Sequence, residues 1–244
     1  MSSSDGPSPD GTTAPDRQLA GMHEDDASEP PASAELVERR VAVAELGDAL
    51  VALASSAIGT EVPVEVLHLA ARDARRLATV LAEQQRRPDE PSSVDELRRG
   101  QRPYNPVVGA GNPVAPPMRI EIVDGAAIGS CTLDWRYEGP FGYAHGGISA
   151  LLLDQVMGYA AAAAGHPGVT GRLTVRYRAT VPLGAPLRVE ARFIDVLGVR
   201  SAIQGSIRLA AAPDVALVEA EGRFLALRSE QADRLFGEGS ETTS

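Results

Sequence analysis

The sequence predicts an α+β fold in which one antiparallel sheet curls around a single buried helix. Within residues 118–228, several segments alternate apolar and polar residues, which is typical of strands. One run, from Gly146 to Ala164, is instead small and apolar nearly all round, as a helix enclosed by a sheet should be. The segments occur as two strands, the helix and four strands, and this order favours a single sheet that wraps the helix.

The remaining residues fall into four segments with different compositions. Residues 1–33 are acidic, rich in Ser, Pro, Gly and Asp, and nearly free of large apolar side chains, so they are predicted to be a disordered tail. Residues 34–87 have helical periodicity and form an N-terminal helical extension. Residues 88–117, rich in Pro, Gly, Asn and Arg, are expected to be an irregular connector. Residues 229–244 are expected to be a second disordered tail.

Two periodic runs predict the two helices of the extension. The first run repeats apolar residues at intervals of three, four or seven: Leu36, Val43, Leu46, Leu50 and Leu53. The second run places these on one face: Val66, Ala70, Leu77 and Leu81. Gly59 stands where the first helix should end, and Pro88 stops the second. The extension is therefore expected to be an antiparallel helical pair or an oligomerisation arm.

Turn residues bound the predicted strands. A hairpin is expected from Met118–Asp124 and Ala127–Tyr137, with its turn at Asp124-Gly125. The four strands after the helix are expected at Leu173–Ala179, Leu187–Leu197, Arg200–Ala210 and Val215–Leu227, with turns at Pro182-Leu183-Gly184, Gly198 and Pro213-Asp214. An open sheet of this kind leaves edges that commonly pair between copies, so a homodimer or tetramer is expected.

Composition argues against several classes of function. The formal net charge is −10, and no basic stripe occurs, so nucleic acid is not an expected partner. Cys131 is the only cysteine, which precludes an internal disulfide and fits a reducing cytosol. The N-terminus lacks the pattern of a secretory signal, and Ile148–Ala164 is short for a membrane span and contains Asp154, so a cytoplasmic chain without a span is expected. The histidines have no metal-ligand spacing, and no metal is expected.

One acidic residue lies inside the predicted apolar helix. Asp154 follows the start of the helix by about two turns, among small and apolar residues. A carboxylate is costly there unless it is paired or used. It can act on a carbonyl either as a general base for water or as a nucleophile. A side chain that faces solvent or caps a neighbouring loop fits the pattern equally, so the position of Asp154 alone leaves both interpretations open.

Paired glycines open the same helix. Gly146 and Gly147 let the backbone approach a ligand closely, and unpaired N–H groups at a helix start can hold a developing oxyanion. Gly146 is the candidate donor, although a simple tight turn would use the same glycines. Taken alone, His145 and Thr170 are more typical of structural residues. The catalytic hypothesis therefore depends on the combination.

Together these residues resemble a known family. The run from His145 to Asp154, then Thr170, Val181-Pro-Leu-Gly184 and Glu219–Ala226, closely resembles the phenylacetic-acid-degradation (PaaI-like) type of hotdog thioesterase. The spacing is specific, since the aspartate follows the histidine by nine residues and the threonine follows the aspartate by sixteen. The resemblance covers roughly residues 103–228. It implies the hotdog fold, an antiparallel sheet wrapped around a long central helix.

The resemblance also implies an activity, the hydrolysis of an acyl-CoA thioester to a free acid and CoA. Asp154 would be the base or nucleophile, the Gly146 N–H with His145 would polarise the thioester oxygen, and Thr170 would orient the water or the carboxylate. Gly147 would line the substrate site, which would lie at a dimer interface. The CoA phosphates would meet Arg176, Arg178 and Arg200, with Arg172 a weaker candidate. No cofactor is implied beyond the CoA of the substrate.

Alternatives to this function remain. Strand alternation places Arg176 and Arg178 opposite Leu173 and Val175, where solvated arginines would look the same. A non-catalytic acyl-CoA-binding hotdog module in an assembly would account for the long extension. A hotdog hydratase or dehydratase usually pairs a catalytic histidine with an aspartate in another arrangement. The acyl group that the protein accepts is not specified by the sequence.

Overall fold

A computed structural model describes residues 33–96 and 102–226. The predicted tails at 1–33 and 229–244 lie outside the described residues, except for Ser33. That residue caps the first helix, since its side chain accepts a hydrogen bond from Leu36 N. The helices are α1 (Ala34–Gly59), α2 (Val64–Leu81) and α3 (Gly146–Ala163). The strands are β1 (Arg119–Val123), β2 (Ala126–Thr132), β3 (Val169–Tyr177), β4 (Pro186–Leu197), β5 (Arg200–Leu209) and β6 (Ala212–Leu225).

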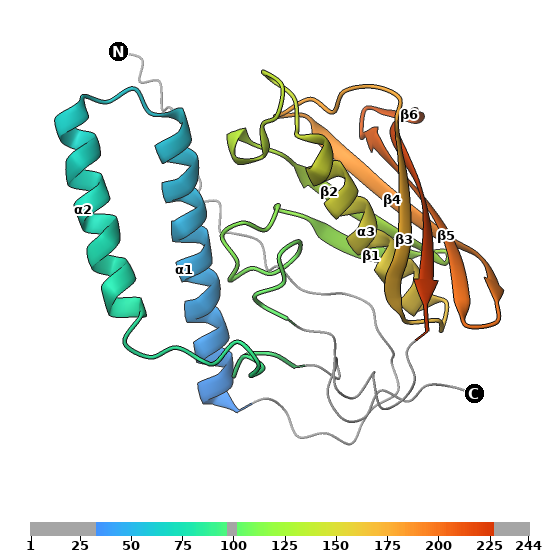
Figure 1. Cartoon of the computed structure of the whole chain (residues 1–244), viewed down its shortest axis with the longest axis horizontal. Helices are drawn as coiled ribbons and strands as arrows, with labels where there is room; N and C mark the ends of the chain where they lie inside the picture. Colours follow the sequence, from blue (N-terminus) through green and yellow to red (C-terminus); the bar gives the residue numbers. More distant parts are fainter. Residues whose placement is uncertain (1–32, 97–101, 227–244) are drawn as a thin grey trace, which may run out of the picture.

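The six strands form one antiparallel sheet that curls around α3 (Figure 1), so the predicted hotdog architecture is confirmed. Their order is β1-β2-β4-β5-β6-β3. The long pairs β4–β5 and β5–β6 form the middle of the sheet, and β3, which follows α3 in the chain, returns to the edge beside β6. This crossover places α3 on the inner face of the sheet and leaves β3 as an edge strand.

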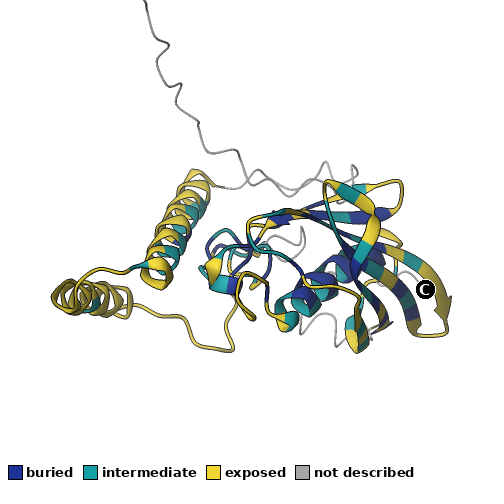
Figure 2. Cartoon of the chain, turned by 90° about the horizontal axis from the view of Figure 1, so that it is seen from above, coloured by how far each residue is buried: buried dark blue, intermediate teal, exposed yellow. Residues whose placement is uncertain are grey.

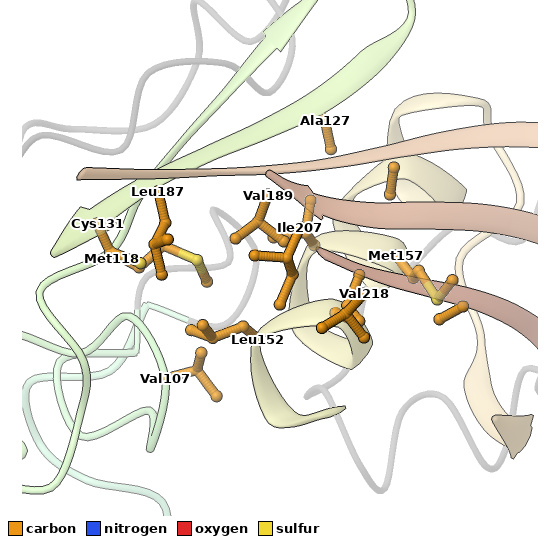
Figure 3. Packing of buried hydrophobic residues seen from close by; sticks show 14 of the residues in the cluster. Val107, Met118, Ala127, Cys131, Leu152, Met157, Leu187, Val189, Ile207 and Val218 are labelled. Carbon is orange, nitrogen blue, oxygen red and sulfur yellow. The ribbon is translucent and has the colours of Figure 1, made fainter. Parts of the chain in front are cut away.

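The core lies between α3 and the inner face of the sheet (Figure 3). Leu152, Val156 and Met157 of α3 are fully buried against strand residues such as Val189 and Ile207. Glycines let the helix approach closely: a Cβ at Gly205 or Gly222 would come within about 3.2 Å of Met157. Small residues on the sheet under a large helix residue fix the distance between the two layers.

Several strand boundaries differ from the sequence prediction. Residues Trp135–Tyr137, expected as the end of the second strand, form a 3-10 helix, because the Asp134 side chain accepts from Arg136 N and starts a turn. The last hairpin turns at residues 210–211, and Pro213 lies near the start of β6, a position in which a strand tolerates proline. Strand β3 begins at Val169, four residues earlier than expected, so Thr170 is inside it.

The predicted extension consists of α1 and α2, which run antiparallel beside the domain (Figure 1). Helix α2 ends at Leu81, so residues 82–87 are turn and loop where helix was expected. Helix α1 contacts the connector and the domain along one side: Arg40 donates to Val94 O of the connector at 3.0 Å and to Glu96 at 3.1 Å. Farther along, Ser55 donates to Asp134 at 3.2 Å. By length and composition alone, α1 could also cross a membrane.

Candidate active site

The loop before α3 is fixed on both sides. His145 N donates to Tyr137 O at 2.8 Å, and Ala144 N donates to Val181 O at 2.8 Å. Within the loop, the Glu138 carboxylate accepts from Gly142 N at 2.8 Å. These contacts join the loop to the strand connection at 181–182, which also pairs with Tyr143. The backbone therefore enters α3 in one defined direction.

His145 is the N-cap of α3. Its Nδ1 accepts a hydrogen bond from Gly147 N at 3.0 Å. An accepting Nδ1 places the proton of the neutral ring on Nε2, which can then donate to a substrate oxygen. The side chain is exposed, so Nε2 is accessible. As the N-cap of α3, His145 uses Nδ1. In the polarising role that the resemblance implies, it would use the other ring nitrogen, Nε2.

Gly146 carries the candidate oxyanion donor. Its N–H is at the first position of α3, where no intrahelical acceptor exists, and it has no hydrogen-bond partner among the described residues. Its carbonyl accepts from the Tyr177 hydroxyl at 2.8 Å, so β3 holds the helix start in place. A Cβ at Gly146 would lie 3.3 Å from the Tyr177 ring. The sequence analysis missed Tyr177, although strand alternation already placed it on the face toward α3.

Asp154 and Thr170 are brought together. The Thr170 hydroxyl donates to Asp154 Oδ1 at 2.7 Å, from β3 to α3. The other oxygen, Oδ2, has no hydrogen-bond partner among the residues that the structure describes. Asp154 is half-buried, so water can reach that oxygen. One carboxylate oxygen is thus oriented by the protein and the other is open.

These residues form two clusters, not one. Gly146 and Asp154 are eight residues apart on one helix, which is about 12 Å along its axis. Their partners on β3, Tyr177 and Thr170, are seven residues apart, or about 23 Å along an extended strand. Within one chain, the oxyanion donor and the carboxylate therefore lie near opposite ends of β3.

The three candidate arginines lie on the outer face of the sheet and do not form one cluster. Arg178 donates to Glu219 at 2.9 Å. Arg176 pairs in register with the same Glu219, whereas Arg200 pairs with Leu225, six residues farther along β6. Six residues of strand are about 20 Å. Arg176 and Arg200 make no ion pair with any described residue.

Other features lie away from these clusters. A hollow of about 600 Å³ at the ends of β2 and β4 is lined by Arg119, Thr132 and Arg188, and it includes no candidate site residue. Burial raises the pKa of the Cys131 thiol to about 12, so it is not a nucleophile at neutral pH. Among the described residues, no group of three or more His, Cys, Asp or Glu side chains could hold a metal ion.

Comparisons with known proteins bear on this fold and site. The family model of the thioesterase superfamily matches residues 141–205, which include His145, Asp154 and Thr170. The crystal structure of protein RHA08564, a thioesterase superfamily protein, is 32% identical with a TM-score of 0.67, over 81% of this chain and 97% of that chain. No curated protein matches.

Two shorter structures are similar to less than half of this chain. The smu.793 protein from Streptococcus mutans UA159, bound to acetyl CoA, is 18% identical with a TM-score of 0.42, over 45% of this chain and 88% of that chain. The PaaI protein from the phenylacetic acid degradation operon of E. coli is 18% identical with a TM-score of 0.40, over 45% of this chain and 80% of that chain.

The fold is that of a hotdog protein of the thioesterase type. With a relative at 32% identity that is matched over 97% of its length, the chain belongs to the thioesterase superfamily. Membership supports a thioesterase-type function.

Proposed function

We propose that the protein hydrolyses acyl-CoA thioesters, with Asp154 as the general base for the attacking water. The observation that carries the proposal is the 2.7 Å hydrogen bond from Thr170 to Asp154 Oδ1, which orients the carboxylate and leaves Oδ2 open. A carboxylate held in this way on an apolar helix, in a family of thioesterases, is suited to accept a proton from water.

The steps follow from the groups present. Asp154 Oδ2 accepts a proton as water adds to the thioester carbonyl, and the carbonyl oxygen becomes an oxyanion. A free N–H at a helix start, such as that of Gly146, stabilises this charge, and His145 Nε2–H adds a second donor. When the C–S bond breaks, the CoA sulfur takes the proton from Asp154. The products are the free acid and CoA, and no cofactor is required.

This mechanism requires two copies of the chain. In the reacting complex, the carboxylate oxygen and the oxyanion donor should be roughly 8 Å apart, with the water and the carbonyl between them. Each contact is about 3 Å, and water approaches the carbonyl at a steep angle. Gly146 and Asp154 of one chain are separated by about 12 Å along α3. Gly146 of one copy therefore acts with Asp154 of the other in a homodimer.

A two-fold axis accounts for such a pairing. Antiparallel α3 helices related by an axis near Ala150 place Gly146 opposite Asp154 of the other copy, twice in each dimer. The side of α3 turned away from the core is only partly buried, at Ala150, Leu151, Asp154 and Gly158. Its two small residues, Ala150 and Gly158, permit close approach. Strand β3, which bonds both Gly146 and Asp154, is at the edge of the sheet.

The first test is thiol release from a panel of short, medium, long-chain and aryl-CoA thioesters. The wild type should release thiol, and Asp154→Asn should lower kcat by about 10² to 10⁴ while its unfolding curve stays close to that of the wild type. Equal turnover in the two proteins would contradict the base role. Binding of CoA thioesters without thiol release would instead favour the non-catalytic module, and hydration of an enoyl-CoA would favour a hydratase.

The second test separates the composite site from a single-chain site. Gly146→Pro removes the N–H at a helix position that tolerates proline, and each variant homodimer should be inactive. Refolding an equal mixture of Gly146→Pro and Asp154→Asn should restore about a quarter of wild-type activity, since half of the dimers then hold one intact site of two. A site within one chain would gain nothing from mixing.

We further propose that the CoA phosphates contact Arg176 or Arg200, the two of the three candidate arginines that make no ion pair with a described residue. Arg178 is already bound to Glu219 and should contribute less. Alanine at the contacting arginine should raise KM for an acyl-CoA with little change in kcat. It should not affect the matching N-acetylcysteamine thioester, which lacks the phosphates. An equal effect on both substrates would contradict a phosphate contact.

A further inference from the structure

The first turn of α3 is the accessible end of a largely buried helix. Most of α3 is buried or half-buried (Figure 2), and within it only Gly147 and Ala163, near its two ends, are exposed. Two side chains, those of His145 and Tyr177, form hydrogen bonds with the backbone of the first turn. The surroundings of the candidate oxyanion donors are therefore set by these two rings.

Each of the paired glycines in this turn makes room for one ring. A Cβ at Gly146 would lie 3.3 Å from ring atoms and the hydroxyl oxygen of Tyr177. A Cβ at Gly147 would lie 3.1 Å from His145 Nδ1 and 3.3 Å from its Cε1. These distances are shorter than an ordinary contact of about 3.5–4.0 Å, so a side chain at either glycine would displace the ring beside it. The two glycines let both rings lie directly on the backbone.

One peptide group connects the two rings. The Tyr177 hydroxyl donates to Gly146 O at 2.8 Å, and Gly147 N donates to His145 Nδ1 at 3.0 Å. Gly146 O and Gly147 N belong to the same planar peptide group. A carbonyl oxygen has two lone pairs, so the bond from Tyr177 can form together with the helical one. The hydroxyl, the peptide group and the His145 ring thus make one hydrogen-bond network.

Both hydrogen bonds of this network donate in the same direction, from Tyr177 toward His145. A donor on the carbonyl draws electron density from the peptide nitrogen and makes its N–H a stronger donor. Hydrogen bonds in series strengthen one another by about 10–30% each. A stronger bond to Nδ1 favours the neutral ring with its proton on Nε2. The Tyr177 hydroxyl therefore acts on His145 through the peptide group.

The backbone of Tyr177 is fixed on both sides. Tyr177 pairs with the fully buried Val218 in the ladder between β3 and β6. Directly after it, Arg178 N and Ala179 N donate to Leu217 O at 2.8 and 2.9 Å. The position of the hydroxyl is thus set by the sheet, and the sheet in turn sets the start of α3.

We propose that Tyr177 is a positioning residue of the thioesterase reaction. Its hydroxyl, through the peptide between Gly146 and Gly147, holds the His145 ring with its proton on Nε2, the nitrogen that donates to the thioester oxygen. Tyr177 does this without touching the substrate. The proposal rests on the proposed function, in which His145 is the second donor to the oxyanion.

The first measurement requires no activity. Tyr177→Phe keeps the ring against Gly146 and removes only the hydroxyl. In the full chain, isotope-labelled at glycine, the Gly147 amide proton should move upfield in the NMR spectrum and exchange with water faster, because its bond to Nδ1 is weaker. The signal is assigned by its loss in Gly147→Ala. Tyr143→Phe, the matched control, removes a hydroxyl from the loop before α3 and should leave this amide as in the wild type. An unchanged Gly147 amide in Tyr177→Phe overturns the proposal.

Kinetics test whether the network serves the reaction. Tyr177→Phe should lower kcat about threefold to tenfold with little change in KM, as expected for the loss of one neutral hydrogen bond. His145→Asn keeps a good N-cap residue but removes the imidazole, and in that background Tyr177→Phe should lower kcat by less than about twofold. An equal loss in both backgrounds overturns the action through His145. If the wild type releases no thiol from any CoA thioester, the proposed function fails, and the Gly147 amide still decides whether Tyr177 acts on His145.

Discussion

The Thr170 hydroxyl donates to Asp154 Oδ1 at 2.7 Å, and this contact can be removed with little change in shape. Thr170→Val keeps the volume but loses the donor. A hydrogen bond to a charged group contributes about 1.5–3 kcal/mol, so kcat should fall about tenfold to a hundredfold with a small change in KM. Steady-state kinetics of thiol release measure both quantities.

The control for Thr170→Val is the same substitution at Thr174, an exposed residue of β3 on the outer face of the sheet. Thr174→Val should leave kcat unchanged. Thr170→Ser retains the hydroxyl and should recover most of the activity. If Thr170→Val were as active as Thr174→Val, the hydrogen bond would have no part in catalysis.

Cys131 provides a second prediction at the scale of one residue. Burial raises the pKa of its thiol to about 12, and the side chain lies in the core. Iodoacetamide at pH 8 should label it in guanidinium chloride but only very slowly in the native protein, because the thiolate is the reactive form. The control is Ser130→Cys with Cys131→Ser, which moves the thiol to the exposed neighbouring position and should react at an ordinary rate. Equal labelling of the two native proteins would contradict the burial of Cys131.

At the scale of the elements, the attachment of α1 depends on one glycine. A Cβ at Gly47 would lie 2.1 Å from Ala110 O and 2.9 Å from Gly111 Cα, both backbone atoms that cannot rotate away. Gly47→Ala should therefore destabilise the protein by about 1–3 kcal/mol in urea unfolding, although alanine favours a helix.

Gly59, the last residue of the same helix, is the matched control. A Cβ at Gly59 would meet nothing within 4 Å. Gly59→Ala should be neutral or stabilise by up to about 1 kcal/mol. Equal effects of the two substitutions would show that α1 is not held against the domain at Gly47.

The elements also show what sequence patterns specify. Helix α3 was predicted to within one residue, because a long, small and apolar run between glycines has few alternatives. The end of the predicted second strand was wrong, because the Asp134 carboxylate bonds Arg136 N and bends the chain, a choice that alternation does not encode. The hydrogen bond between Thr170 and Asp154 forms because β3 returns to the sheet edge beside β6. The spacing of the two residues in the sequence does not predict that crossover. Asp154 was a candidate from its place in the apolar helix, with a structural reading equally open, whereas Thr170 was predicted as a site residue only through the resemblance.

For the whole molecule, one carboxylate joins α1 to the domain, and a second one binds arginines of its own strand. Glu190 binds Arg188 and Arg192 on the outer face of the sheet, and Asp134 binds Arg136 of the domain and Ser55 of α1. Burial alone would raise the pKa of Asp134, but hydrogen bonds and the charge of Arg136, with a hydrogen bond from Ser55, hold that pKa below its usual value. The pKa of Glu190 is likewise lowered, because its arginines outweigh the effect of burial.

A carboxylate whose pKa is lower in the folded than in the unfolded state stabilises the folded protein. This stabilisation is fully present above the unfolded-state pKa and is lost as the pH falls through the folded-state pKa. For carboxylates the unfolded value is about 4. Asp134→Asn should therefore be less stable than the wild type at pH 7, and the difference should shrink below about pH 4, where the wild-type carboxylate becomes protonated. Urea unfolding of both proteins from pH 7 to pH 3 measures this difference. A difference between wild type and Asp134→Asn that stays constant down to pH 3 would mean that the charge of Asp134 does not hold α1 to the domain.

A double variant tests the contact between Asp134 and α1. Because Asp134 bonds Ser55 of α1, Asp134→Asn combined with Ser55→Ala should destabilise the protein by less than the sum of the single variants. Glu190 does not bond α1, so the effects of Glu190→Gln and Ser55→Ala should be additive.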